Sequence, residues 1–242
     1  MTAPWKWHFE FFNEFDALQS NEYPNLRQNT DNFRLNVGLP FHLELDVDAP
    51  YLYIDRAIDI PSSEGTGDTN MGIKWEFRPP KDGSRTPGLG ASLYVEVPTG
   101  NVRQQLGSGL TDYWLNFIIQ EPLTPKTRIN TNLGFLFAGN TSTGVLGTQN
   151  TRGHVYTGGA SLLHDFTPRL TLGAEIYGGI ADKDQLARSQ LQGMVGAQYQ
   201  LRDGLGLAFG VLGGKYIASP RVGVQAGFAI DLPDLLRPPK PD

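Results

Sequence analysis

The sequence predicts an all-β protein, a transmembrane up-and-down antiparallel β-barrel of about twelve strands. Three observations predict this fold class. Apolar and polar residues alternate with a period of two in one segment after another, the connections between segments are alternately long and short, and aromatic residues gather at the segment ends. The composition agrees, because 29 of the 242 residues are glycine and only 19% are charged, less than in typical soluble domains.

The alternation is clearest in the first segment, where Trp7, Phe9 and Phe11 alternate with His8 and Glu10. Twelve segments can be delimited in this way, although in one of them, 153–164, both faces are semi-polar. The segments span residues 5–12, 33–37, 42–48, 70–77, 89–97, 113–120, 129–137, 153–164, 170–177, 191–200, 205–211 and 222–230. An even number of strands places both ends of the barrel domain on the same side of a membrane.

The connections support this assignment. Those expected to be long span residues 17–30, 48–66, 98–109, 138–152 and 180–189. Those expected to be short span residues 38–41, 121–126, 165–169 and 202–204, while 78–86 is intermediate and 213–220 moderate. Outer-membrane barrels have short periplasmic turns and long outer loops, so we expect a periplasmic N-terminus. The barrel domain is then 1–231, and the proline-rich residues 232–242 form a periplasmic tail.

Aromatic residues form two predicted bands, as Trp and Tyr do at membrane–water interfaces. At the periplasmic ends these are Trp5, Trp7, Trp75, Tyr199 and Phe228, and at the outer ends Tyr113, Phe135 and Phe137. A soluble β-sandwich or lipocalin-like barrel would also show alternating strands. Twelve regular strands, two aromatic bands and long loops at one end only weigh against that alternative.

Other classes of protein are excluded by composition. No apolar run is long enough for a transmembrane helix, and the chain has no cysteine for disulfides or thiolate chemistry. A net charge of −5 without a basic block argues against nucleic-acid binding. Residues 2–9 lack the basic start of a signal peptide, so we expect this to be a mature or engineered form of a protein located in the bacterial outer membrane.

Six short motifs carry a resemblance to a known family. They are Leu39-Pro40-Phe41-His42-Leu43-Glu44-Leu45, Gly65-Thr66-Gly67-Asp68, Met71-Gly72-Ile73-Lys74-Trp75, Val95-Glu96-Val97-Pro98-Thr99-Gly100, Gly107-Ser108-Gly109-Leu110-Thr111-Asp112-Tyr113 and Asn132-Leu133-Gly134-Phe135. In this order, over roughly residues 30–230, they resemble a family of proteobacterial outer-membrane transporters assigned to the meta-cleavage pathway of phenol degradation. The resemblance implies a twelve-stranded barrel and uptake of aromatic or other hydrophobic compounds, and it implies no site residues.

Charged residues on the polar face of the strands are the candidate site. The lumen-lining candidates are Lys6, His8, Glu10, Arg34, His42, Glu44, Asp46, Lys74, Glu76, Glu96 and Glu175. Such a wall could orient a solute or set ion selectivity, or its charges could pair across the lumen and fill it. Six carboxylates face three Lys and Arg residues in this set, so complete pairing needs water or histidine.

Catalytic and metal sites find little support in the sequence. Ser161 lies an odd number of residues from His154 and His164, so it points to the opposite face of the strand and forms no hydrolase pair. We expect no enzyme activity, no bound metal and no cofactor.

The expected function is a passive channel for small solutes, with hydrophobic or aromatic compounds among them. The alternative is a closed, structural or partner-binding barrel without transport activity. In both cases the expected partners are outer-membrane lipid and, through the long outer loops or residues 232–242, another protein.

Overall fold

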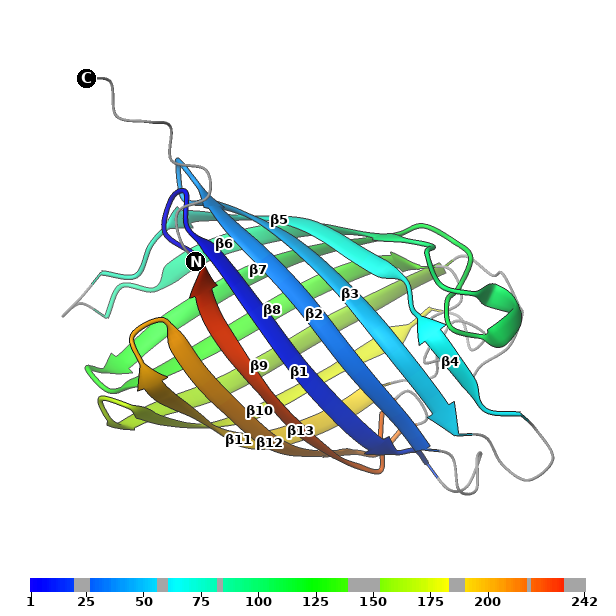
Figure 1. Cartoon of the computed structure of the whole chain (residues 1–242). Helices are drawn as coiled ribbons and strands as arrows, with labels where there is room; N and C mark the ends of the chain where they lie inside the picture. The colour runs from blue at the N-terminus through cyan, green and yellow to red at the C-terminus, as the bar shows by residue number, and fades with distance from the viewer. Residues whose placement is uncertain are drawn as a thin grey trace, which may run out of the picture.

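One closed sheet forms most of the described part of the chain (Figure 1). The computed structural model describes residues 1–19, 27–55, 61–81, 85–138, 153–182, 190–216 and 219–232. Its strands are β1 (Trp7–Ala17), β2 (Arg27–Leu39), β3 (Leu43–Asp55), β4 (Ser63–Thr66), β5 (Thr69–Arg78), β6 (Gly88–Val97), β7 (Asp112–Thr124), β8 (Thr127–Ala138), β9 (Gly153–Thr167), β10 (Leu170–Ala181), β11 (Gln190–Arg202), β12 (Leu205–Gly214) and β13 (Val222–Leu232). A short 3-10 helix, η1 (Val102–Gln104), precedes β7. Among the described residues, no helix is long and apolar enough to cross a membrane.

The barrel closes where the first strand meets the last. β1 pairs with β13 along its whole length, from Trp7 opposite Leu232 to Ala17 opposite Val222, and it pairs with β2 on its other side. All pairings between the named strands are antiparallel. They join strands that follow each other in the chain, except for the β1–β13 closure and the pairing of β3 with both β4 and β5. β4 continues the pairing of β5 with β3 beyond a break at residues 67–68. The predicted up-and-down barrel of twelve strands is therefore confirmed, with β4 and β5 sharing one position.

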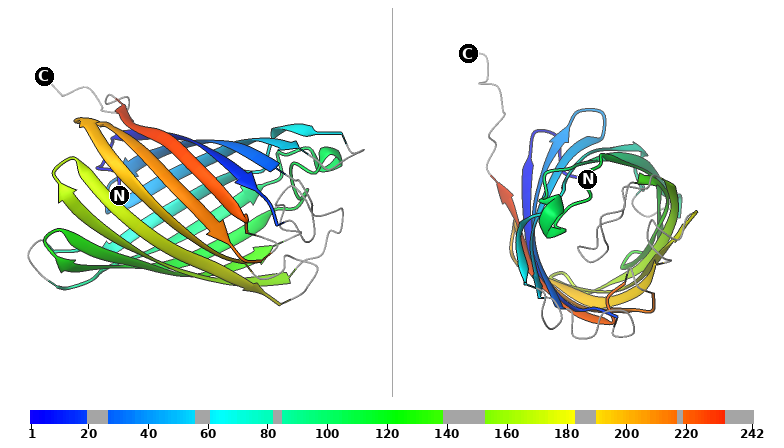
Figure 2. Two further views of the ribbon diagram at one scale, coloured as in Figure 1. Left: turned by 90° about the horizontal axis from the view of Figure 1, so that it is seen from below. Right: turned by 90° about the vertical axis from the view of Figure 1, so that its right-hand side faces the viewer.

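The strands are tilted and staggered. One row of directly paired residues runs from Trp7 through Val37, Leu45, Ile73, Leu93, Leu115, Phe135 and Tyr156 to Ile180. It starts at one end of the barrel and finishes at the other. Such a shift in register is what closes a twisted sheet into a cylinder, and it gives the oblique strands of Figure 1 and the ring seen along the axis in Figure 2.

The two ends of the barrel differ in their connections. At one end, β2–β3, β7–β8, β9–β10 and β11–β12 are joined by tight turns, and we call this the short-turn end. In the last of these turns Gly204 has a φ of +71°, which only glycine adopts without cost, next to Asp203. The opposite, long-loop end carries η1 and lies on the right in Figure 1. This confirms the alternation of short and long connections, apart from the intermediate β5–β6 connection at the short-turn end, residues 79–87, and the moderate β12–β13 connection at the long-loop end, residues 215–221.

Two predicted strand ends were wrong. Trp5 and Lys6 precede β1, because Trp5 has a φ of +65° and its N–H donates to the carbonyl of Gly38 at 2.7 Å. His42 lies in the turn between β2 and β3, because Phe41 and His42 have φ values of +64° and +57° and reverse the chain there. The alternation of apolar and polar residues continues through Trp5 and His42, so the sequence gives no sign of these left-handed conformations. In addition, β2 and β3 extend well beyond the predicted segments 33–37 and 42–48.

The two faces of the sheet are inverted relative to a soluble protein. Leu45 and Val47 on β3 are 42% and 41% exposed, while Glu44 and Asp46, which alternate with them, are 4% and 2% exposed. Along the other strands, large apolar side chains are again exposed on the outward face. A soluble barrel would bury these apolar residues, whereas a lipid-facing wall leaves them on the outside.

Closure of the barrel yields a first prediction. A Cβ on Gly227, on the inward face of β13, would lie 2.3 Å from the carbonyl oxygen of Phe11 and 2.6 Å from the Cβ of Phe12. Gly227→Val should therefore weaken the β1–β13 seam by about 1–3 kcal/mol. The unfolding midpoint in urea, followed by the mobility shift of the folded barrel on unheated gels, should decrease.

Gly158→Ala is the matched control, since its Cβ would meet its nearest atoms at an ordinary 3.6 Å. An unchanged midpoint for Gly227→Val would contradict the β1–β13 pairing described above.

Candidate functional site in the barrel interior

Most of the predicted charged residues share the inward face of the sheet. Across β2, β3 and β5, Arg34 pairs with Asp48 and Glu44 with Lys74, so their side chains point to the same side. The same register continues around the barrel and places on that face His8, Glu10, Arg34, Glu44, Asp46, Lys74, Glu76, Glu96 and Glu175. Lys6 and His42 are at the rim of the short-turn end, where His42 Nδ1 lies 3.7 Å from Glu76 Oε2.

Lys74 holds two buried carboxylates. Its Nζ lies 3.0 Å from Glu44 Oε1 and 3.2 Å from Asp46 Oδ2. The hydroxyl of Tyr94 donates a hydrogen bond to Asp46 Oδ2 at 2.6 Å, and the backbone N–H of Thr2 donates to Glu44. One cation thus faces two anions, and a neutral donor adds a hydrogen bond to each carboxylate, while Asp46 Oδ1 has no hydrogen-bond partner among the described residues.

A second chain of charges crosses β3, β2, β1 and β13. Arg34 Nη2 lies 2.7 Å from Asp48 Oδ2, and Arg34 Nη1 lies 3.4 Å from Glu10 Oε2. His8 continues the chain, with its Nε2 3.4 Å from Glu10 Oε1 and its Nδ1 2.6 Å from Asp231 Oδ1. The ion pairs therefore link neighbouring strands along the wall.

Most of these contacts lie in one half of the interior, which we call the charged half, formed by β2, β3, β5 and β6. Asn36, Glu44, Asp46 and Ser92 are each 5% exposed or less, although they are polar and face the interior. Side chains packed against each other, and against residues 2–4 near Gly38, leave little free space along this part of the wall.

The other half of the interior is open. It is formed by β9 to β13, and we call it the glycine-rich half because glycine, alanine and glutamine dominate its inward face. Glu175, Gln198 and Ala208 point inward there and are nevertheless exposed. Two recesses of ≈ 290 and ≈ 410 Å³ lie along it and share Gln198 and Ala208 in their walls. They form one groove that runs toward the short-turn end.

Several inward-facing groups were missed by sequence reasoning. Asp48 and Asp231 complete the charge chain, and Tyr94 completes the Lys74 cluster. Further inward carboxylates are Glu14, Asp16, Asp112 and Asp165. They lie at the ends or just outside the predicted segments, and extending the same period of two would have found them. The inward face is consequently more acidic than the predicted set indicated.

The long-loop end is narrowed by the connection between β6 and β7. Asp68 is 5% exposed and accepts hydrogen bonds from the backbone N–H of Gly100 at 2.9 Å and of Ser108 at 2.7 Å. The Thr99 hydroxyl donates to the carbonyl of Gly67 at 2.8 Å. Gly107 lies so close to Asp68 that a Cβ would be 2.3 Å from Oδ1. Three of the motifs noted in the sequence thus meet at one carboxylate.

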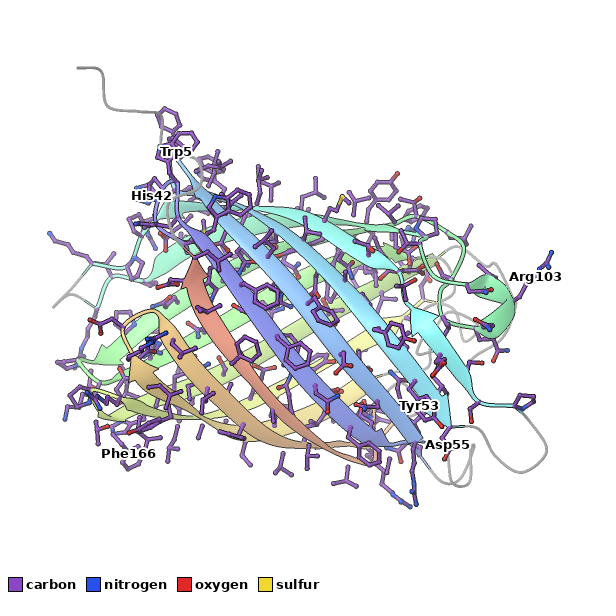
Figure 3. All side chains as sticks on the ribbon, viewed as in Figure 1. Trp5, His42, Tyr53, Asp55, Arg103 and Phe166 are labelled. Carbon is purple, nitrogen blue, oxygen red and sulfur yellow. The ribbon has the colours of Figure 1, made fainter. Side chains whose placement is uncertain are left out.

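Leu106 fixes the same connection to the inside of the wall. Its side chain is 1% exposed and packs with Ile54, which is also 1% exposed, against Leu18 and Leu52. Ile54 lies on the inward face of β3, so Leu106 is inserted into the mouth of the barrel rather than extending outward. Figure 2 shows this segment and η1 within the outline of the ring, and Figure 3 shows Arg103 at the end of the molecule.

The predicted aromatic residues that lie in strands are on the outward face. Trp75 is 52% exposed and Tyr199 41% exposed near the short-turn end, and Tyr113 is 48% exposed at the long-loop end. Trp7, Phe135, Phe137 and Phe228 share that face. Tyr51, Tyr53, Tyr156 and Phe166 are further exposed outward aromatics, of which Figure 3 labels Tyr53 and Phe166. Two bands at membrane interfaces remain a prediction for these residues.

The candidate hydrolase residues are separated by the wall. Ser161 pairs with Glu175 on the inward face, while His154 and His164 point outward. His164 Nδ1 lies 2.9 Å from the Thr127 hydroxyl, and His154 stacks on Phe135. Within the described ranges, no group of three or more His, Asp or Glu side chains is placed to hold a metal ion.

Comparison with known proteins finds one matching family and several solved structures with this architecture. The model of the family described as "Putative MetA-pathway of phenol degradation" matches residues 13–232. An outer membrane channel from Pseudomonas putida F1 is similar in structure, with a TM-score of 0.75, 15% identity, and 96% of this chain and 97% of that chain covered. The NanC porin (TM-score 0.64, 7% identity, 93% and 100% covered) and the KdgM porin (0.59, 9%, 93% and 99%) share the fold. No curated protein matches by sequence.

The Lys74 cluster yields a second prediction. Lys74→Met leaves Glu44 and Asp46 buried without their cation, which should cost about 3–5 kcal/mol of unfolding free energy. Urea unfolding in detergent micelles, followed by tryptophan fluorescence, measures this loss. The triple variant with Glu44→Gln and Asp46→Asn should recover most of it. A triple variant as unstable as Lys74→Met would show that the lysine stabilises the barrel by packing alone.

The Asp68 anchor yields a third prediction. Asp68→Ala removes two hydrogen bonds to a charged acceptor, each worth about 1.5–3 kcal/mol, and should free the connection between β6 and β7. Trypsin should then cut after the exposed Arg103 roughly tenfold faster while the barrel stays folded. Glu64→Ala, an exposed carboxylate nearby, is the control. Equal cleavage rates in the two variants would argue against the anchor.

Proposed function

The chain belongs to the phenol-degradation family whose model it matches, and we propose that it is a passive channel for small solutes in the bacterial outer membrane. The observation that supports this most is the groove along the glycine-rich half. Inward-facing Glu175, Gln198 and Ala208 stay exposed there, beside a half of the interior that is closed by paired charges. A barrel whose only task was structural would have no need of an unfilled half.

The location is supported by the outer wall. Exposed apolar side chains cover the outward face, and lipid is the environment in which they are stable. The long-loop end then faces the outside and the short-turn end the periplasm, as in other barrels with short periplasmic turns.

The solutes that fit are small. Twelve strands give an interior between the filled eight-stranded barrels and the wide sixteen-stranded porins. The charged half and the inserted Leu106 narrow it further. The family description refers to phenol degradation, and Trp114 is 36% exposed on the inward face of β7, which supports aromatic compounds among the solutes.

The mechanism is diffusion without chemical change. A solute enters past the connection held by Asp68, passes along the groove, and leaves between the short turns. The paired charges of Lys74 and Arg34 keep the charged half rigid, so that the width of the path is constant. We propose no catalytic residue.

Blocking the groove tests this function. Ala208 lines both recesses and is exposed, so Ala208→Trp places a large ring in the groove. Conductance in planar bilayers and the efflux of small solutes from proteoliposomes should fall roughly tenfold. Val195→Trp, on the outward face of β11 and outside both recesses, carries the same ring on the lipid side and should conduct like the original protein.

The alternative of a closed barrel makes the opposite prediction. In that case, the purified protein passes neither ions nor solutes, and Ala208→Trp changes nothing. Either result overturns the proposed channel.

A further inference from the structure

The periplasmic mouth, at the short-turn end, has one acidic wall. The ≈ 410 Å³ recess lies there, between β1, β11, β12 and β13. Glu10 and Asp231 line it, with His8 between them at 3.4 and 2.6 Å. Because Glu10 also lies 3.4 Å from Arg34, the negative charge that faces the open mouth is that of Asp231. The carboxylate of Asp231 is mostly exposed, with 62% of its side chain accessible, so its charge acts on the open mouth.

A second recess, of ≈ 660 Å³, lies at the same end between the β5–β6 connection and the β7–β8 hairpin. Of the residues that the structure describes, four basic ones line it, namely Lys81, Arg85, Lys126 and Arg128, and no carboxylate does. Arg128 also contacts Asp165 at 3.2 Å, while Lys81, Arg85 and Lys126 form no ion pair within the described part of the chain.

The basic recess opens to the inside of the barrel. Gly88 pairs with Gln120, whose side chain faces inward, and a Cβ on Gly88 would lie 2.8 Å from Pro80. Pro80 therefore covers the inward face of Gly88 at the rim of the mouth, and Lys81 follows it directly in the chain.

The two recesses lie on opposite walls. In the closed sheet, β2 and β3 separate them on one side, and β9 and β10 separate them on the other. Opposite charges thus face each other across the same opening. Between such walls, in a narrow passage, the electric field is directed across the path rather than along it.

We propose that this field selects dipolar solutes, small molecules that carry separated positive and negative groups. The inference rests on the proposed channel function and specifies its substrate class. A zwitterion turns its cationic group toward Asp231 and its anionic group toward Lys81, Arg85 and Lys126. A solute with one charge is attracted by one wall and repelled by the other. Its electrostatic stabilisation in the passage is therefore smaller than that of a zwitterion.

Three solutes of nearly equal shape separate the charge classes. Trimethylglycine is a zwitterion, choline is a cation, and 3,3-dimethylbutanoate is the anion in which carbon replaces nitrogen. Their efflux is measured as radiolabelled tracers from proteoliposomes in potassium chloride, which removes diffusion potentials. Trimethylglycine should leave faster than both others, by about threefold or more.

Variants in which neutral side chains replace the charged ones test which residues form the two walls. Lys81→Gln/Arg85→Gln/Lys126→Gln should remove the advantage of trimethylglycine over choline, and Asp231→Asn should reduce its advantage over the anion. Arg169→Gln/Arg202→Gln removes two exposed basic residues of other short turns, outside both recesses, and should leave the order of rates unchanged.

The outcomes are distinguishable. If no solute crosses, the channel function itself fails. If all three cross at equal rates, or if the control double variant changes the order as much as the triple variant does, the channel stands and the transverse field is rejected.

Discussion

Pairing of the first strand with the last is the constraint from which the rest of this structure follows. In lipid, each backbone N–H and C=O must find a partner within the protein, so a sheet can span the membrane only when it has no open edge. Here β1 and β13 meet over their full lengths, from Trp7 opposite Leu232 to Ala17 opposite Val222. That register fixes the stagger of the other strands, the diameter of the interior and the face to which each side chain points. Once the diameter is fixed, the volume of the inward side chains decides how much of the interior remains open.

The interior is divided by two kinds of packing. Around Lys74 and Arg34, long charged side chains pair with carboxylates of neighbouring strands and exclude free space. Burying these ions costs solvation, which the pairing and the added hydrogen bonds offset. Around Ala208 the side chains are too small to reach the opposite wall, and a groove remains. The Asp68 anchor and Leu106 restrict one end of this groove, and opposing charged recesses border its other end.

The sequence alone predicts the parts of this arrangement that depend on local periodicity. The alternation of Glu44 and Leu45 gives both the strand and the face of each side chain, and turn lengths give the two ends. The sequence does not predict that Trp5 and His42 lie outside the strands, because the positive φ values there depend on contacts with distant residues. It also misses Asp68 as an anchor, because its partners lie more than thirty residues away along the chain. Glycine and glutamine on the last strands do indicate the open half, but the recesses depend on how neighbouring strands are staggered.

The division of the interior is tested most directly by the access of water to single positions. The chain contains no cysteine, so one introduced thiol reports on one site. Gln198→Cys in the glycine-rich half and Ser92→Cys in the charged half are both on the inward face. In proteoliposomes, a small, charged thiol reagent that does not cross lipid should modify Gln198→Cys at least about tenfold faster than Ser92→Cys. Equal rates, or a protected thiol at position 198, would contradict an open groove beside a filled half.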